Sequence, residues 1–169
     1  MLRGSRGLTA GASAIGFGFV QADLPAIVTF LAWGDVEPPS FPEGEAPECE
    51  NTDIIQNSFK GKSVGPKPPP ATFVPVEFLN YLITLVHDSR QQGWVREAKE
   101  QQHLVRMLLK AKRHLEASDP GKARSALKEF LQRVKEEGCR GFDCPKHKAL
   151  TSEAYALLFF NGQFLWERL

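Results

Sequence analysis

The sequence lacks a dominant charge, and this excludes one large class of function. Its 21 Lys and Arg nearly cancel its 20 Asp and Glu, which leaves a formal net charge of +1 over 169 residues. A dedicated nucleic-acid-binding domain is normally strongly basic, so we expect no nucleic-acid partner. Hydrophobic residues make up 42% of the chain and charged residues 24%, a composition typical of a globular protein.

The sequence also lacks the motifs that would name a reaction. No GxGxxG or HExxH pattern occurs. Gly61-Lys62-Ser63 matches the end of a P-loop, but Gln56 stands where that motif has its first glycine, and no clear strand precedes it. We therefore predict no catalytic residue, no cofactor-binding residue and no cofactor.

No hydrophobic run is long enough to cross a membrane. The apolar stretch from Leu8 to Trp33 is interrupted by Gln21, Asp23 and Pro25. A membrane-spanning helix needs about 20 predominantly apolar residues, so we expect no transmembrane segment.

Three interpretations of residues 1–33 remain open. Arg3 and Arg6 followed by a weakly hydrophobic stretch and Val20-Gln21-Ala22 fit a secretory signal peptide cleaved before Asp23. Alternation over Ser13–Val20 and β-branched residues over Ala26–Trp33 instead predict two strands of a truncated domain, joined by a turn at residues 23–25. A buried helix is the third alternative.

Proline is scarce only in the second half, and this uneven distribution divides the chain. Ten of the twelve prolines fall between Pro25 and Pro75. Proline fixes φ and removes a backbone donor, so residues 34–75 read as a Pro/Glu-rich linker in which no central strand fits. The predicted organisation is an apolar segment at 1–33, this linker at 34–75 and a helical bundle at 76–169.

Helical periodicity begins after Pro75. The pattern predicts a first helix from Pro75 or Val76 ending near Gly93, a second over about 97–117, a third from Asp119-Pro120 to Gly138, and a fourth from Thr151. The predicted fold class is therefore mainly α, a three- to four-helix bundle preceded by a Pro-rich extended segment and a short β or signal-like stretch.

The last predicted helix is apolar around most of its circumference. One interpretation is a central core helix buried on several sides. The other is an interaction surface for a neighbouring domain or partner, formed by its large aromatic residues, Phe159, Phe160, Phe164 and Trp166.

Several segments of the helical half resemble the FIMAH domain. Leu104–Ala111 with His114–Ala117 is similar to its "SLxxKLxxAxxxL" helix, Ala126–Val134 to its "LxxFIxxV" helix, and Leu150–Leu158 to its last helix. The resemblance covers about residues 78–169. It departs at residues 118–121, where the family has a plain glycine turn, and at a longer loop over 139–148. It implies a C-terminal accessory domain of a secreted or cell-surface bacterial protein, with no catalytic role.

Cys139 and Cys144 flank a short loop between two helices. A disulfide between them is feasible, and a secreted setting permits it. The alternative is a metal site that adds His147 and either Cys49 or His103, but this spacing fits no standard zinc pattern, so we predict no metal.

Basic residues dominate the two middle helices, with acidic residues interleaved. The simpler interpretation is two solvated faces with i,i+4 pairs, and the functional one is a mild patch for an anionic polysaccharide. We expect a non-catalytic accessory or interaction domain of an exported bacterial protein, with neighbouring domains or surface polysaccharide as partners. The alternatives are a polysaccharide-binding module and a fragment of a larger secreted enzyme.

Overall fold

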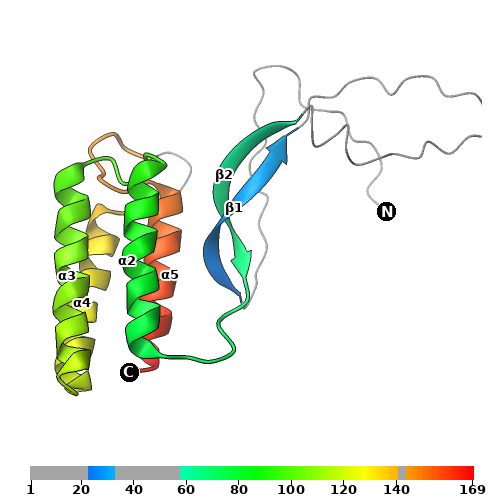
Figure 1. Cartoon of the computed structure of the whole chain (residues 1–169). Helices are drawn as coiled ribbons and strands as arrows, with labels where there is room; N and C mark the ends of the chain where they lie inside the picture. Colours follow the sequence, from blue (N-terminus) through cyan, green and yellow to red (C-terminus); the bar gives the residue numbers. More distant parts are fainter. Residues whose placement is uncertain (1–22, 33–57, 141–143) are drawn as a thin grey trace, which may run out of the picture. The chain divides into compact units, whose positions relative to one another are not determined.

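The part of the chain that the structure describes is mainly helical, with four helices and a small two-stranded sheet (Figure 1). The computed structural model describes residues 23–32, 58–140 and 144–169. These residues divide into two compact units, a larger one of residues 23–28, 62–140 and 144–169 and a smaller one of residues 29–32 and 58–61. The elements are β1 (Leu24–Ala32), β2 (Phe59–Lys67), α2 (Pro75–Gln91), α3 (Ala98–Glu116), α4 (Pro120–Glu137) and α5 (Ser152–Glu167).

The helices begin and end where local sequence signals place them. Pro75 occupies the first turn of α2, and Gly93 adopts a φ of +75° just beyond its end, a left-handed conformation that glycine reaches without steric cost. Asp119 caps α4 by accepting a hydrogen bond from the backbone N–H of Lys122 at 3.0 Å. Thr151 caps α5 in the same way, with Ala154 as the donor. The prediction of a mainly helical second half with four helices is confirmed.

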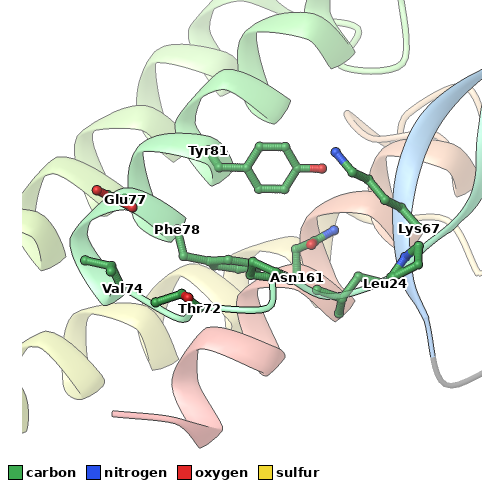
Figure 2. A pocket seen from close by; sticks show the side chains of 10 residues that line it. Leu24, Lys67, Thr72, Val74, Glu77, Phe78, Tyr81 and Asn161 are labelled. Atoms are coloured by element: carbon green, nitrogen blue, oxygen red, sulfur yellow. The ribbon is translucent and has the colours of Figure 1, made fainter.

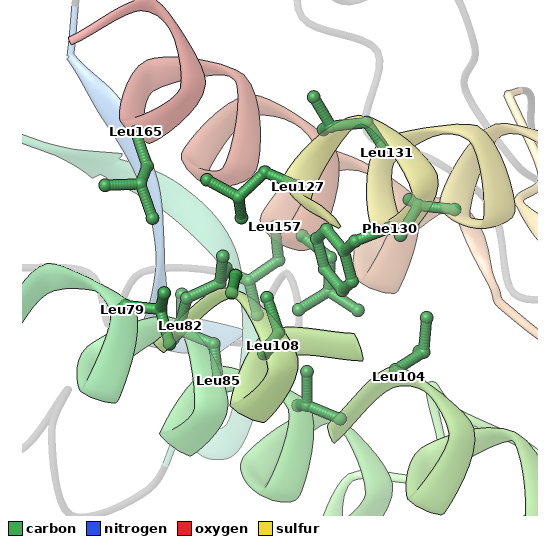
Figure 3. Packing of buried hydrophobic residues seen from close by; sticks show 14 of the residues in the cluster. Leu79, Leu82, Leu85, Leu104, Leu108, Leu127, Phe130, Leu131, Leu157 and Leu165 are labelled. Carbon is green, nitrogen blue, oxygen red and sulfur yellow. The ribbon is translucent and has the colours of Figure 1, made fainter. Parts of the chain in front are cut away.

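The four helices enclose one hydrophobic core (Figure 3). Each helix contacts the next along the chain, and α2 also contacts α5. The four helices therefore form a closed ring of contacts around the core. Leucines from every helix are fully buried, and Phe130 of α4 is the largest fully buried side chain. Burial of such side chains is the main favourable contribution to folding.

The sheet differs from the sequence prediction in its partner strand. β1 pairs with β2, whose residues lie inside the range that proline content predicts to be a linker. The arrows of β1 and β2 run in opposite directions in Figure 1. The predicted turn at residues 23–25 is wrong, because β1 already begins at Leu24 and includes Pro25.

Strand β2 contains two glycines and a proline, residues that argue against a strand in the sequence. The structure explains why each is tolerated. A strand with one neighbour leaves backbone donors unpaired on its other side, so it tolerates proline such as Pro66. Gly65 lets β1 approach closely, since a Cβ there would lie 2.7 Å from Cγ2 of Val28. Gly61 likewise faces the ring of Phe30.

Several expectations concern residues outside the described part of the chain. The possible strand at 13–20, the signal peptide and Cys49 all belong to this group, so they stay predictions. Within residues 23–32, 58–140 and 144–169, no helix combines the length and the apolar character needed to cross a bilayer.

Candidate interaction surface on helices α4 and α5

Helix α5 is buried along one side and carries large aromatic rings on the others. Six of its residues are buried in the core: Ala154, Leu157, Leu158, Asn161, Gly162 and Leu165. Phe159, Phe164 and Trp166 are half-buried, whereas Phe160 is 49% exposed. The helix is therefore a core element on one side and carries partly exposed aromatic residues on the others. Each of the two interpretations of its sequence, core helix and aromatic surface, describes one part of it.

Three rings of α5 contact one another in a row. The rings of Tyr155 and Phe159 are stacked, with centroids 5.3 Å apart and planes inclined by 5°. Phe160 meets Phe159 edge to face at 5.5 Å. Aromatic pairs in this distance range are favourable beyond the apolar area that they bury. The row is therefore an ordered surface.

A cation lies over each of three aromatic rings on this side of the bundle. Arg140 lies 5.5 Å from the centroid of Tyr155, and Lys135 lies 5.1 Å from that of Phe159. Arg124 lies 5.0 Å from the ring of Trp166, and its Nε also donates a hydrogen bond to the Trp166 carbonyl at 3.1 Å. Cation–π attraction holds these long side chains close to the α4/α5 surface. We call Arg124, Lys128, Lys135 and Arg140 together with Tyr155, Phe159, Phe160 and Trp166 the α4/α5 surface.

A shallow groove runs between the two helices within this surface. Its volume is about 260 Å³, and it is lined by Lys128, Leu131, Gln132, Lys135, Phe159, Gln163 and Trp166. The indole N–H of Trp166 is buried and finds no acceptor among the described residues. A buried donor without an acceptor is costly, so Trp166, which also lines the groove, has an unsatisfied donor.

The basic side chains of this surface are not neutralised by neighbouring carboxylates. Within the described part of the chain, none of Arg124, Lys128 and Lys135 forms an ion pair. The carboxylate of Glu129 instead pairs with Lys110 of α3 at 2.9 Å. These three cations are therefore available to a ligand, while Glu136 and Glu167 accept hydrogen bonds from the groove residues Gln132 and Gln163.

Phe164 lies apart from the other predicted surface aromatics. Its ring centroid is 5.1 Å from that of Phe78 and 5.7 Å from that of Phe73, so it packs against the start of α2. Arg168 covers the ring at 3.5 Å from the centroid. The structure thus brings Phe159 and Phe160 together on the α4/α5 surface but places Phe164 elsewhere.

Cys139 and Cys144 lie next to each other at the end of α4. Burial, together with a hydrogen bond to the Cys139 side chain, raises the pKa of the Cys144 thiol. Arg96 holds the following loop, since its Nη1 donates to the carbonyls of Pro145 and Lys148 at 3.0 and 3.1 Å. The disulfide between the two cysteines stays a prediction, and the proximity of their side chains is compatible with it.

The histidines considered as metal ligands do not converge. Across residues 23–32, 58–140 and 144–169, no three His, Cys, Asp or Glu side chains gather closely enough to hold a metal ion. His147 is exposed in the loop after Cys144, and His103 is half-buried on α3. Gly61-Lys62-Ser63 lies inside strand β2 and opens no helix, so it lacks the phosphate-binding geometry of a P-loop.

Comparison of the chain with protein-family models, with curated proteins and with solved structures found no match. The resemblance to the FIMAH domain therefore rests on the core-packing motifs of the sequence. The α4/α5 surface is consequently the feature from which a function is best argued.

Proposed function

We propose that this protein is a non-catalytic accessory domain that associates with an anionic surface polymer, such as an acidic polysaccharide, through its α4/α5 surface. The observation that carries the proposal is the placement of Arg124, Lys135 and Arg140, each over an aromatic ring at 5.0–5.5 Å. These cations form no ion pair with the described residues of the chain.

The spacing of the basic residues suits a linear polyanion. Arg124, Lys128 and Lys135 recur at helical spacing along one side of α4. With a rise of 1.5 Å per residue, the row from Arg124 to Lys135 is about 16 Å long. A polymer with regularly spaced carboxylate or sulfate groups can contact several of these cations at once, and such repeated contacts raise its overall affinity.

The groove between α4 and α5 supports the same choice of partner. Gln132 and Gln163 line it beside apolar ring surface. Each side-chain amide donates one hydrogen to a glutamate, Glu136 or Glu167, and keeps its second hydrogen for a ligand. Hydroxyl and carboxylate oxygens of a sugar can accept such hydrogen bonds, while the carbon face of a sugar ring packs on an aromatic side chain. An apolar core with convergent polar groups is the usual composition of a binding site.

The non-catalytic role and the cellular setting have their own support. Gly61-Lys62-Ser63-Val64-Gly65 matches the letters of GxSxG, but it lies inside strand β2 and not at the strand-to-helix turn that a nucleophile of that motif needs. The family resemblance also implies an accessory domain. The same resemblance is the basis for placing the protein outside the bacterial cell or at its surface.

Affinity electrophoresis tests the proposal directly. Polygalacturonate in the gel should retard the protein at low salt, neutral dextran should not, and the retardation should decrease steeply as salt is added. Arg124→Gln combined with Lys135→Gln should abolish most of the retardation, because it removes two of the cations of the α4/α5 surface.

A matched variant separates surface geometry from net charge. Arg106→Gln combined with Arg113→Gln removes two exposed cations from α3, where their guanidinium groups donate only within that helix. This control should retain nearly all of the polygalacturonate retardation. Equal losses in the two double variants would contradict the proposal, and so would stronger retention by single-stranded DNA than by polygalacturonate.

A further inference from the structure

A second hollow lies on the opposite side of α5, where the chain enters α2 (Figure 2). Its volume is about 260 Å³, and every lining residue belongs to the larger compact unit. Apolar walls come from Leu24, Pro68, Pro70, Val74 and Phe78. Polar groups come from Lys67, Thr72, Glu77, Tyr81 and Asn161. We call this hollow the α2 pocket.

Two hydrogen-bond donors converge at one end of the α2 pocket. Figure 2 shows the Tyr81 hydroxyl and the Lys67 ammonium pointing toward one another, and Lys67 Nζ lies 5.9 Å from the centroid of the Tyr81 ring. Burial, with a smaller contribution from Asp88, raises the pKa of Tyr81, so its hydroxyl stays protonated and can donate at neutral pH. Lys67 makes no ion pair with the described residues.

Asn161, one of the residues that line the pocket, has a buried acceptor without a partner. Its Nδ2 donates two hydrogen bonds of 2.8 Å, one to the Pro25 carbonyl and one to the Leu157 carbonyl. Because both partners are acceptors, the amide orientation is fixed, with the nitrogen toward them. The opposite atom, Oδ1, is buried and accepts no hydrogen bond from the described residues. A completely buried polar side chain with one unmet acceptor calls for a donor from elsewhere.

The charges around the pocket are asymmetric. Glu77 lies on the side away from Lys67 in Figure 2, with Phe78 between them. A ligand anion is therefore favoured at the Lys67 end and disfavoured at the Glu77 end. The apolar side chains between the two ends accommodate an uncharged body of modest size.

From these groups we infer that the α2 pocket binds the C-terminal residue of a peptide whose last side chain is apolar. The free carboxylate accepts from Lys67 Nζ and the Tyr81 hydroxyl. The apolar side chain packs on Phe78 and Val74. The amide N–H of the same residue donates to Asn161 Oδ1, which satisfies the buried acceptor. This site is separate from the α4/α5 surface and does not depend on the function proposed for it.

The minimal probe is N-acetyl-phenylalanine, which contains each of these groups once. Titration followed by ¹H–¹⁵N correlation spectra should shift the amide signals around Lys67, Phe78 and Tyr81. N-acetyl-phenylalaninamide lacks the carboxylate and should bind about fivefold more weakly. A pentapeptide of four alanines and a C-terminal phenylalanine should bind at least as tightly as the acid, and its C-terminally amidated form should lose that affinity.

Matched variants test the contributing side chains without altering the core. Lys67→Met should weaken binding of N-acetyl-phenylalanine about fivefold, whereas Lys60→Met on the same strand, outside the pocket, should leave it unchanged. Tyr81→Phe should weaken binding as well, and Tyr155→Phe should not. Retained spectral dispersion shows that each variant is folded.

Three results would overturn the inference. One is equal affinity for the acid and the amide, which would remove the role of the carboxylate. Another is unchanged affinity in both Lys67→Met and Tyr81→Phe. The third is tighter binding of the free acid than of the pentapeptide, which would identify the ligand as a small molecule and not a chain end.

Discussion

Arg133 of α4 holds Glu100 of α3 in a two-pronged ion pair, with Nε 2.9 Å from Oε1 and Nη2 2.7 Å from Oε2. Glu100 is only 6% exposed, whereas a third of the Arg133 side chain is open to solvent. The hydrogen bond to Glu100 raises the pKa of Arg133. The pair therefore links two helices at the edge of the core, with the carboxylate as its buried member.

Removing the arginine should cost more than removing both charged groups. Arg133→Met leaves a buried carboxylate without its partner and should lower the free energy of unfolding by about 2 kcal/mol, toward the low end for buried pairs because Arg133 is partly exposed. Adding Glu100→Gln to this variant should recover much of the loss. Urea denaturation of the wild type, both single variants and the double variant measures the coupling, and strictly additive effects would contradict a direct interaction.

Gly162 of α5 lies where a methyl group would be tightly packed against α4. A Cβ there would lie 3.0 Å from Cδ2 of Leu131 and 3.1 Å from Cε1 of Phe130, both on α4. Gly162→Ala should therefore forfeit most or all of the gain of about 1 kcal/mol that alanine brings to an open helix position, because Leu131 and Phe130 must give way to admit the methyl group.

Gly121 provides the matched control for this prediction. It lies in the first turn of α4, where a Cβ meets only Asp119 Oδ1 at 3.7 Å. Gly121→Ala should be neutral or stabilising by up to about 1 kcal/mol, because alanine favours the helix. Thermal unfolding compares the two variants, and equal shifts in Tm would contradict the packing argument.

The cap of α4 should give the stability an acid-sensitive component. Hydrogen bonds from the side chain and the backbone N–H of Lys122 lower the pKa of Asp119 below its usual range. Because the pKa of Asp119 is lower in the folded state than in the unfolded state, its ionised carboxylate stabilises the fold. This stabilisation is fully present above the unfolded-state pKa, about 3.9. It is lost as the pH falls through the folded-state pKa.

Asp119→Asn isolates the charge, because asparagine is an equally good capping residue. We expect the variant to have a lower Tm than the wild type at pH 7, with a difference that shrinks as the pH falls below about 4. A Tm difference that is constant from pH 7 to pH 2 would contradict the role of the carboxylate.

Cys139 and Cys144 should form a disulfide under mild oxidation. In a Cys49→Ser background, diamide should take up two hydrogens from the two thiols, so that the protein mass falls by two hydrogens and alkylation is blocked. In the reduced protein, alkylation of Cys144 should become fast only at a higher pH than for an ordinary thiol, because its pKa is raised.

A matched variant tests the pairing. Cys144→Ser in the same background should keep its mass under diamide, since an intramolecular bond is no longer possible. An unchanged mass of the two-cysteine protein after oxidation would contradict the pairing.

Much of the helical half could be predicted from local sequence signals. The caps at Asp119 and Thr151, the glycine after α2 and the apolar spacing each act over a few residues, so the sequence alone predicts them. Strand β2 could not be predicted in this way. Its glycines and Pro66 argue against a strand locally, and only the neighbouring β1 supplies the contacts that stabilise it.

The candidate sites were predictable in part. The aromatic character of α5 indicates Phe159 and Phe160, but no local signal separates them from Phe164, which packs against Phe73 and Phe78. The α2 pocket joins residues from three separate segments, so no local pattern predicts it. The one available signal was Asn161, a polar residue within an otherwise apolar stretch of helix.

The sequence by itself determined that the second half is helical, where each helix starts and stops, and that the total charge is near zero. These properties follow from backbone geometry, capping hydrogen bonds and composition, which need no distant partner. Only the tertiary structure decided which cations lie over which rings, that Lys67 and Tyr81 meet at one pocket, and that β1 has β2 as its neighbour. Those relationships join residues far apart in the chain, and they form because packing one shared core fixes the register of the four helices against one another, while pairing with β1 fixes β2.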